Sequence, residues 1–185
     1  MNIASLGLSA LTCEYANNSS KVFGSRATYL YNALRSDWKY RKNIVPLEYT
    51  SQTLDPDGEP LVQSEPAVYL LSVCNGRFFG GGMKIAPMAD PTDGEFDVVL
   101  LRNISWWHAA LTLSSQIYSG NHVADQQRVK HWKTRELSVR TIDSAAERVL
   151  VECDGENVGF VPVVFAMQPR TLRLVVPENM SFSSE

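Results

Sequence analysis

The sequence has few cysteines, and their placement gives no sign of a disulfide framework. Three are present in 185 residues, at Cys13, Cys74 and Cys153. No C-x-x-C spacing occurs, and an odd, scattered set favours free thiols in a reducing compartment over a disulfide scaffold or a zinc site. Cys74 and Cys153 lie in apolar, strand-like contexts, so we expect both to be buried.

Long apolar runs and an excess of positive charge are also missing. No charged segment followed by an apolar one opens the chain, and no apolar run reaches the length of a membrane span. The formal net charge is −3, so the chain lacks the basic character of a nucleic-acid-binding protein. We therefore expect a cytoplasmic protein, peripheral at a membrane at most, that does not bind nucleic acid.

Standard catalytic signatures are absent as well. The run Gly80–Lys84 resembles a phosphate-binding loop only superficially, because its lysine does not follow the last glycine directly and no Ser or Thr comes next. No G-x-S-x-G elbow occurs. The histidines match no ligand spacing such as H-E-x-x-H, and surface or capping roles are expected for them. They are His108, His122 and His131.

What the chain does have is a succession of short strand-like segments separated by turn residues. This pattern predicts a mainly β domain of the sandwich or barrel type with a few helices. The predicted strands are 67–73, 96–101, 137–142, 149–153, 158–166 and 172–176, and a hairpin joins 47–54 to 61–63 through Asp57-Gly58.

Two stretches have helical patterns instead. Ala27, Leu30, Leu34 and Trp38 form one apolar stripe at helical spacing. A second helix is predicted from an N-cap at Ser105, through residues 106–117, to an end near Gly120. No linker divides the chain, so residues 1–177 are expected to form one domain and residues 178–185 a flexible tail.

The tripeptide Asp-Gly-Glu occurs three times, at Asp57–Glu59, Asp93–Glu95 and Asp154–Glu156. Such a unit can be a hairpin turn, a ligand for a hard cation or the position of a general base. The second copy lies in an acidic loop with Asp90 and Asp97, which suits either a Mg²⁺ site or a polar loop. The residues alone leave these alternatives open.

Three segments in the expected order resemble a family of lipid kinases. The run 75–99, NGRFFGGGMKIAPMADPTDGEFDVV, resembles the signature of the diacylglycerol kinase, sphingosine kinase and bacterial YegS-type superfamily. Asn2–Gly7 is similar to the family's N-x-A-x-x-G strand, and 151–156 with 172–177 resemble its end. The resemblance implies the β-rich C-terminal domain of a kinase that phosphorylates a lipid hydroxyl, as in diacylglycerol or a sphingoid base.

The same resemblance implies roles for particular residues. It makes Glu156 the general base that accepts the proton of the lipid hydroxyl, with Asp154 in support. The floor of the substrate cleft would be formed by Asn75, Gly80, Gly81 and Gly82. Trp106 and Trp107 suit either lipid contact or ordinary packing.

The resemblance also implies a structural Mg²⁺ site in the acidic loop. Its ligands would be the side chain of Asp93 and the backbone carbonyls of Asp90 and Glu95. ATP would be the co-substrate, bound mainly by an N-terminal domain that has no counterpart here, since the family's Gly-Gly-Asp-Gly-Thr-type loop does not occur. We therefore expect the isolated chain to be inactive.

The partners implied are a lipid substrate, the missing nucleotide-binding domain and, transiently, a membrane surface. The oligomeric state stays open, a homodimer included. Two other functions compete with the kinase: a non-catalytic lipid-binding or regulatory module derived from such an enzyme, and a metal-assisted hydrolase built on the acidic loops.

Overall fold

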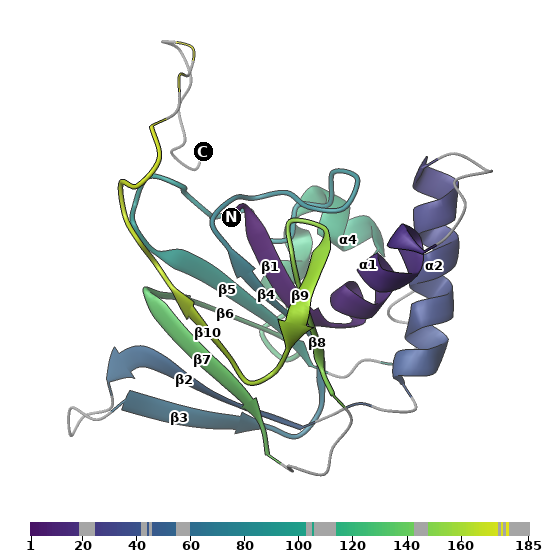
Figure 1. Cartoon of the computed structure of the whole chain (residues 1–185), viewed down its shortest axis with the longest axis horizontal. Helices are drawn as coiled ribbons and strands as arrows, with labels where there is room; N and C mark the ends of the chain where they lie inside the picture. The colour runs from purple at the N-terminus through teal and green to yellow at the C-terminus, as the bar shows by residue number, and fades with distance from the viewer. Residues whose placement is uncertain are drawn as a thin grey trace.

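The strands of the protein form two antiparallel sheets. The computed structural model describes residues 1–18, 25–41, 44, 46–54, 60–102, 105, 114–142, 148–173, 175 and 177. Within them, the larger sheet has the order β6-β5-β4-β1-β8-β9 and the smaller one β10-β7-β2-β3 (Figure 1). In the described chain no pairing closes either sheet on itself, so the fold is a sandwich, as expected, and not a barrel.

The six strands of the larger sheet come from both ends of the chain. They are β1 (Ile3–Gly7), β4 (Val68–Cys74), β5 (Phe96–Arg102), β6 (Val129–Thr134), β8 (Leu150–Cys153) and β9 (Glu156–Phe160). The smaller sheet consists of β2 (Leu47–Leu54), β3 (Pro60–Glu65), β7 (Glu136–Thr141) and β10 (Val163–Ala166).

The main apolar core lies between the two sheets. Leu71 and Val98 of the larger sheet pack in one cluster with Leu137 and Phe165 of the smaller one. A second cluster, which includes Leu70, lies on the other face of the larger sheet. Because both faces of this sheet are covered, β1 and β4 are buried at every residue instead of alternating.

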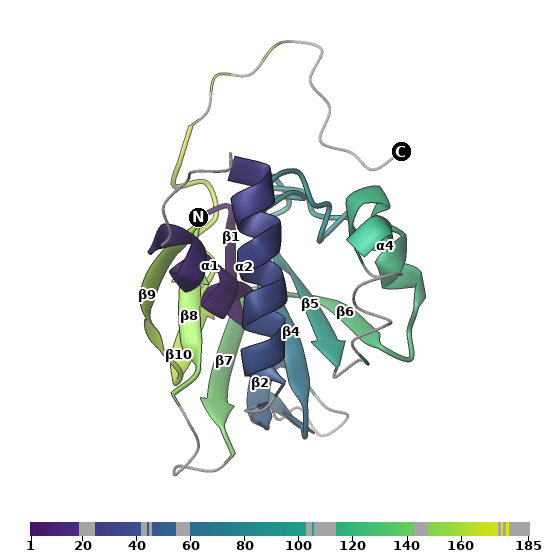
Figure 2. The ribbon, with the colours of Figure 1, turned by 90° about the vertical axis from the view of Figure 1, so that its right-hand side faces the viewer.

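The helices lie on the side of the larger sheet that faces away from β2 and β3 (Figures 1 and 2). They are α1 (Leu8–Asn17), α2 (Ser25–Tyr40) and α4 (Ser114–Ser119), with the 3-10 helix η2 (Asn121–Ala124) after α4. The Tyr40 hydroxyl attaches α2 to the sheet by donating to the carbonyl of Val68 at 2.7 Å. Trp38 was expected on the packed stripe, yet 67% of it is exposed.

Gly7 makes the tight passage from β1 into α1. Its φ is 87°, a left-handed backbone conformation that residues other than glycine rarely adopt. A Cβ at this position would lie 2.8 Å from the carbonyl oxygen of Tyr69. The glycine that ends the N-x-A-x-x-G segment is therefore required by its backbone conformation and by its close approach to β4.

Several predicted elements need correction. The run 158–166 is two strands in different sheets, β9 and β10, because Pro162 between them cannot donate a ladder hydrogen bond. The described residues of 172–176 form no strand, and β6 and α1 were not predicted. The second predicted helix ends as expected before Gly120, although only its last part, α4, is described.

Other predictions fall partly outside the described residues. The hairpin tip with Asp57–Glu59, the tryptophans Trp106 and Trp107, His108 and the tail 178–185 all lie there. Cys74 is buried, as predicted, whereas Cys153 is only half-buried. A surface or capping role was expected for His122, which is in fact buried within η2, with its Nε2 2.9 Å from the carbonyl oxygen of Ile85. All three cysteines are free thiols.

Candidate functional site

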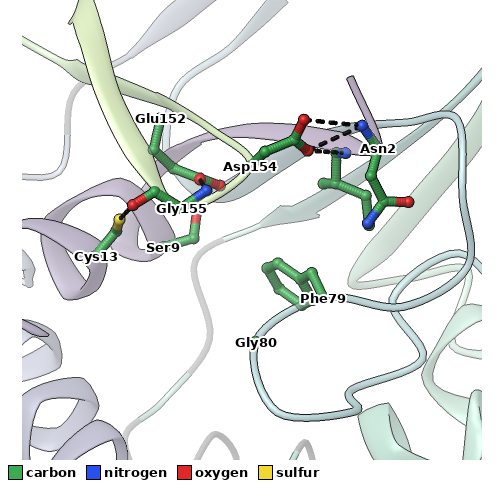
Figure 3. Close-up of a pocket in the computed structure, with 9 residues that line it drawn as sticks. Asn2, Ser9, Cys13, Phe79, Gly80, Glu152, Asp154 and Gly155 are labelled. Carbon is green, nitrogen blue, oxygen red and sulfur yellow. Dashed lines mark hydrogen bonds between the residues drawn. The ribbon is translucent and has the colours of Figure 1, made fainter.

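A pocket of about 300 Å³ opens where β1, β8, α1 and the loop after β4 meet (Figure 3). Most of its wall is apolar, with polar side chains such as Glu152 and Asp154 among the lining residues. The lining residues are Asn2, Ile3, Ser9, Cys13, Phe79, Gly80, Glu152, Asp154 and Gly155. The pocket therefore joins the two ends of the sequence pattern, the opening segment and the third Asp-Gly-Glu copy.

The third Asp-Gly-Glu copy forms the turn between β8 and β9. Asp154 and Gly155 have φ values of 51° and 90°, as in the hairpin turns whose two central residues are left-handed. The Asp154 carboxylate accepts the backbone N–H groups of Asn2, at 2.9 Å, and Ile3, at 2.9 Å (Figure 3). Charge-assisted hydrogen bonds to a chain segment about 150 residues away thus hold the turn.

Helix α1 holds the same turn from its other side. The amide of Asn17 donates to the carbonyl oxygen of Gly155 at 2.9 Å, and the Cys13 thiol donates to it at 2.8 Å. Burial and the negative charges of Glu152 and Glu156 raise the pKa of this thiol to about 11. Cys13 is therefore a protonated hydrogen-bond donor near neutral pH and not a reactive thiolate.

Glu152 is the buried acidic group of the pocket. Only 5% of the residue is exposed, and its carboxylate accepts the Ser5 hydroxyl and, at 3.0 Å, the Gly155 N–H. The Ser5 hydroxyl also lies 2.6 Å from the Ser9 hydroxyl at the pocket wall. Burial raises the pKa of Glu152, although both of these hydrogen bonds favour the charged form.

Glu156, the residue matched to the catalytic base, begins β9 and is exposed. It pairs across the hairpin with Cys153 and does not itself line the pocket. It directly follows Gly155, which does line the pocket, so its backbone lies at the pocket edge. Glu156 thus lies beside the pocket and open to a reacting partner.

The residues matched to the cleft floor are only partly brought together. Gly80 lines the pocket, whereas Asn75, Gly81 and Gly82 are not among its lining residues. The N–H of Asn75 donates to the carbonyl of Asn2 at 2.8 Å, which ties the loop after β4 to the start of β1. Gly81 and Gly82 are exposed, with open space where a Cβ would stand.

The acidic loop lies before β5, and the carboxylates of Asp90 and Asp93 already have hydrogen-bond partners in the protein. Asp90 accepts the N–H and hydroxyl of Thr92, and these hydrogen bonds lower the pKa of Asp90. Asp93 accepts the N–H of Glu95 at 2.9 Å, and its second oxygen lies 2.6 Å from the Lys133 ammonium. A positive charge is therefore already present at the carboxylate matched to the metal site.

This oxygen set suits a hard cation in its chemistry. One carboxylate with two carbonyls and water is a usual Mg²⁺ environment. Mg²⁺ at Asp93 would have to replace the ammonium of Lys133, which also lies 3.0 Å from Asp97. Among the described residues, no three His, Cys, Asp or Glu side chains form a group able to hold a metal. Mg²⁺ in this loop would therefore have to be held by backbone oxygens besides the Asp93 carboxylate.

Sequence reasoning missed Glu152, Ser5 and Ser9 as members of the site. The signal available was a glutamate in an apolar strand, 149–153, that precedes the Asp-Gly-Glu turn. A charged residue within a strand covered on both faces has to find polar partners inside the protein. The partners could not be foreseen, because Ser5 is 147 residues away in sequence.

The fold and the pocket define an open two-sheet β domain with an acidic turn at the end of its larger sheet. The family model described as "YegS C-terminal NAD kinase beta sandwich-like domain" matches residues 2–176. The chain belongs to this family. The expected resemblance and the sandwich fold are therefore confirmed.

Two relatives agree with this assignment. The chain is 28% identical to "Putative lipid kinase YtlR" of Bacillus subtilis (strain 168), over 94% of this chain and 53% of the relative. It is 27% identical to "Diacylglycerol kinase" of the same organism, over 97% of this chain and 54% of the relative. It thus spans about half the length of these relatives.

A solved structure is similar in fold. "Crystal structure of a putative diacylglycerol kinase from Bacillus anthracis str. Sterne" matches with a TM-score of 0.56 at 18% identity. The match covers 91% of this chain and 49% of that one. Across the described residues, no helix has both the length and the apolar character needed to cross a membrane.

Proposed function

We propose that this chain is the substrate-binding half of an ATP-dependent lipid kinase. The reaction transfers the γ-phosphoryl group of ATP to a hydroxyl of a lipid such as diacylglycerol or a sphingoid base. The observation that supports it is the pocket on the Asp154–Glu156 turn, in a chain whose matched relatives are named lipid and diacylglycerol kinases. ATP is bound mainly by a separate nucleotide-binding half, so the chain alone is inactive.

In this proposal Glu156 is the general base. The lipid hydroxyl gives its proton to the Glu156 carboxylate, its oxygen bonds to the γ-phosphorus, and ADP leaves with the bridging oxygen. The exposed position of Glu156 beside the pocket suits a group that meets its substrate across an interface. Asp154 holds the turn through its bonds to Asn2 and Ile3 and takes no proton.

The base assignment is tested by joining the chain to the nucleotide-binding half of the Bacillus subtilis diacylglycerol kinase and measuring lipid phosphorylation. Glu156→Gln should lower kcat by at least about a hundredfold, because the amide cannot accept the proton. Glu136→Gln, an exposed glutamate of β7, is the matched control and should be fully active. Full activity of Glu156→Gln would exclude this residue as the base.

The same assay separates the kinase from a lipid-binding module. In one outcome, the fusion protein sediments with lipid vesicles and binds ATP through its nucleotide half, yet transfers no phosphate to the lipid. That result would favour the non-catalytic module.

Mg²⁺ belongs to the proposal as a structural ion of the acidic loop. The Asp93 carboxylate and the carbonyls of Asp90 and Glu95 would hold it, and its charge would fix the loop before β5. Mg²⁺ should then raise the Tm of the wild-type chain and of Glu95→Gln, whose carbonyl is intact. It should not raise the Tm of Asp93→Asn. Equal behaviour of the two variants would rule out this ligand set.

A transient membrane surface also belongs to the proposal. On α2, Tyr31 and Trp38 are 65% and 67% exposed, one helical repeat apart, with exposed Arg35 between them and Lys39 beside them. Aromatic rings with basic side chains suit the interface of an anionic bilayer. Asp37, an acidic residue of α2, is instead turned inward to Tyr69 and Arg41.

Vesicle sedimentation tests this face on the chain itself. Phosphatidylcholine vesicles that contain phosphatidylglycerol should retain the wild type more than pure phosphatidylcholine vesicles do. Trp38→Ser should lose most of this retention, and Val164→Ser, an equally exposed apolar residue on β10, is the matched control. Equal retention of both variants would remove α2 as the contact.

A further inference from the structure

Among the described residues, Glu152 differs from the other buried acidic residues because it forms no ion pair with a cation. Its carboxylate accepts hydrogen bonds from the Ser5 hydroxyl and the Gly155 N–H. Within the described chain, no Lys, Arg or His side chain lies within ion-pair distance of it. A buried carboxylate without a counter-charge is costly, and such groups gather at functional sites. The question is what this carboxylate does.

A chain of hydrogen bonds runs through Glu152 from the pocket wall to the catalytic turn. The Ser9 hydroxyl on α1 is 2.6 Å from the Ser5 hydroxyl on β1, which bonds to one carboxylate oxygen of Glu152. The other oxygen accepts the N–H of Gly155 at 3.0 Å. These hydrogen bonds connect the β1–α1 segment to the β8–β9 turn, which is distant in sequence, and they end one residue before Glu156.

Gly155 is the one residue between Asp154 and the proposed base. Its carbonyl accepts hydrogen bonds from Cys13 (Figure 3) and Asn17, and its N–H donates to Glu152. With the backbone fixed on both sides, the direction in which the Glu156 side chain leaves β9 is set. Well-placed catalytic groups usually depend on such support, because errors of about 1 Å cost much of the rate.

We propose that Glu152 is a positioning residue, which fixes the Gly155 amide and thereby aims the Glu156 carboxylate into the reaction site. The inference rests on the proposed kinase function. We assign Glu152 no proton-accepting role, because its two oxygens are directed to the Ser5 hydroxyl and the Gly155 N–H. Its action passes through the backbone of the turn, and it touches neither nucleotide nor transferred phosphate.

Glutamine is the informative substitution, because it keeps the shape and one acceptor oxygen. In Glu152→Gln the amide oxygen accepts the Gly155 N–H, and the amide NH₂ donates to Ser5, which donates in turn to Ser9. A positioning role therefore survives in Glu152→Gln and fails in Glu152→Ala. A role in accepting a proton fails in both variants.

The first test uses the chain itself and needs no activity. Amide hydrogen exchange of Gly155 should quicken at least about tenfold in Glu152→Ala and return to within about twofold of wild type in Glu152→Gln. The Leu71 amide in the core reports whether the whole fold has loosened. Unchanged Gly155 exchange in Glu152→Ala, with Leu71 still protected, would overturn the proposal.

The second test measures kinetics in the fused kinase. Glu152→Ala should lower kcat about tenfold with KM nearly unchanged, whereas Glu152→Gln should stay within about twofold of wild type. A Gln variant as impaired as the Ala variant would show that charge or proton acceptance matters, and would overturn the positioning role.

Ser5→Ala keeps the test decisive if Glu152→Ala does not fold. It removes the link to Ser9 but leaves the Glu152–Gly155 bond, so Gly155 exchange should quicken only about threefold. If it exceeds the Glu152→Ala prediction, Glu152 is not what holds the amide. Full activity of Glu156→Gln would overturn the base and not the exchange result, so the two proposals fail separately.

Discussion

Two buried glutamates at opposite ends of the sandwich have opposite environments. Glu65 on β3 and Glu152 on β8 are each 5% exposed. Glu65 is paired with two cations, Arg102 at 3.2 Å and Lys130, whose hydrogen bonds and charges lower its pKa. Glu152 has a hydroxyl and a backbone N–H as partners, and burial raises its pKa.

The difference separates a structural carboxylate from one that serves a site. The single negative charge of Glu65 is balanced by Arg102 of β5 and Lys130 of β6, which fasten β3 to the edge of the larger sheet. Glu152 faces a pocket whose described lining residues include no cation, and its hydrogen bonds lead to the β8–β9 turn. Equal burial therefore says little about role, whereas the partners of the buried charge say a great deal.

The largest expected effect of this contrast is on stability. Glu65→Ala should lower the free energy of unfolding by about 3 kcal/mol, because it leaves Lys130 and Arg102 without their shared partner in a half-buried position. Glu152→Ala should cost about 1 kcal/mol, since it leaves only a hydroxyl and an N–H beside the pocket. Urea denaturation of both variants measures the difference, and a larger loss in Glu152→Ala would break the comparison.

The pH dependence should have opposite signs at the two residues. Because the folded-state pKa of Glu65 is lowered, its contribution is present above about pH 4.5 and is lost as the pH falls through the folded value. The folded-state pKa of Glu152 is raised, so its contribution is complete below about pH 4.5 and is lost as the pH rises through the folded value.

Gln variants of the two residues make this visible. Relative to wild type, Glu152→Gln should gain stability as the pH rises above about 4.5, whereas Glu65→Gln should lose stability as the pH rises from acid towards about 4.5 and change little above it. Denaturation curves between acidic and neutral pH supply the measurement. Parallel pH profiles for the two variants would contradict the assignment of the charges.

The smallest expected effect is the response to salt. Going from about 0.05 to about 1 M NaCl shortens the screening length several-fold, and the partly exposed ends of the Glu65 ion pairs are open to it. The stability difference between wild type and Glu65→Gln should shrink by about 0.5 kcal/mol. The corresponding stability difference between wild type and Glu152→Gln should stay constant, because Glu152 forms no ion pair among the described residues.

Much of the fold could be predicted from local patterns. Strands such as β4 and β5 were predicted within one or two residues, because buried apolar runs bounded by turn residues are a strong signal. β6 was missed because it contains Lys130, His131 and Lys133, and such a sequence resembles an exposed charged segment. The run 158–166 was predicted as one strand because periodicity does not show that a chain changes sheets.

The candidate site was predicted less completely. The matched run 151–156 pointed to Asp154 and Glu156, and in the structure this segment forms the turn between β8 and β9. Glu152 in the same run was given no role, because its meaning depends on Ser5 and Gly155. The partners of Asp154 were equally out of reach, since they are the N–H groups of residues about 150 positions earlier.

By itself, the sequence determined the family, the mainly β architecture and the order of the motifs, because these follow from short-range patterns and from spacing along the chain. The tertiary structure decided which charges are buried and what each one meets. Antiparallel pairing of β8 with β1 brings the end of the chain against its beginning, so Glu152, Ser5 and Asn2 become neighbours. Desolvation and hydrogen bonding act through such contacts in space, and only the folded chain creates them.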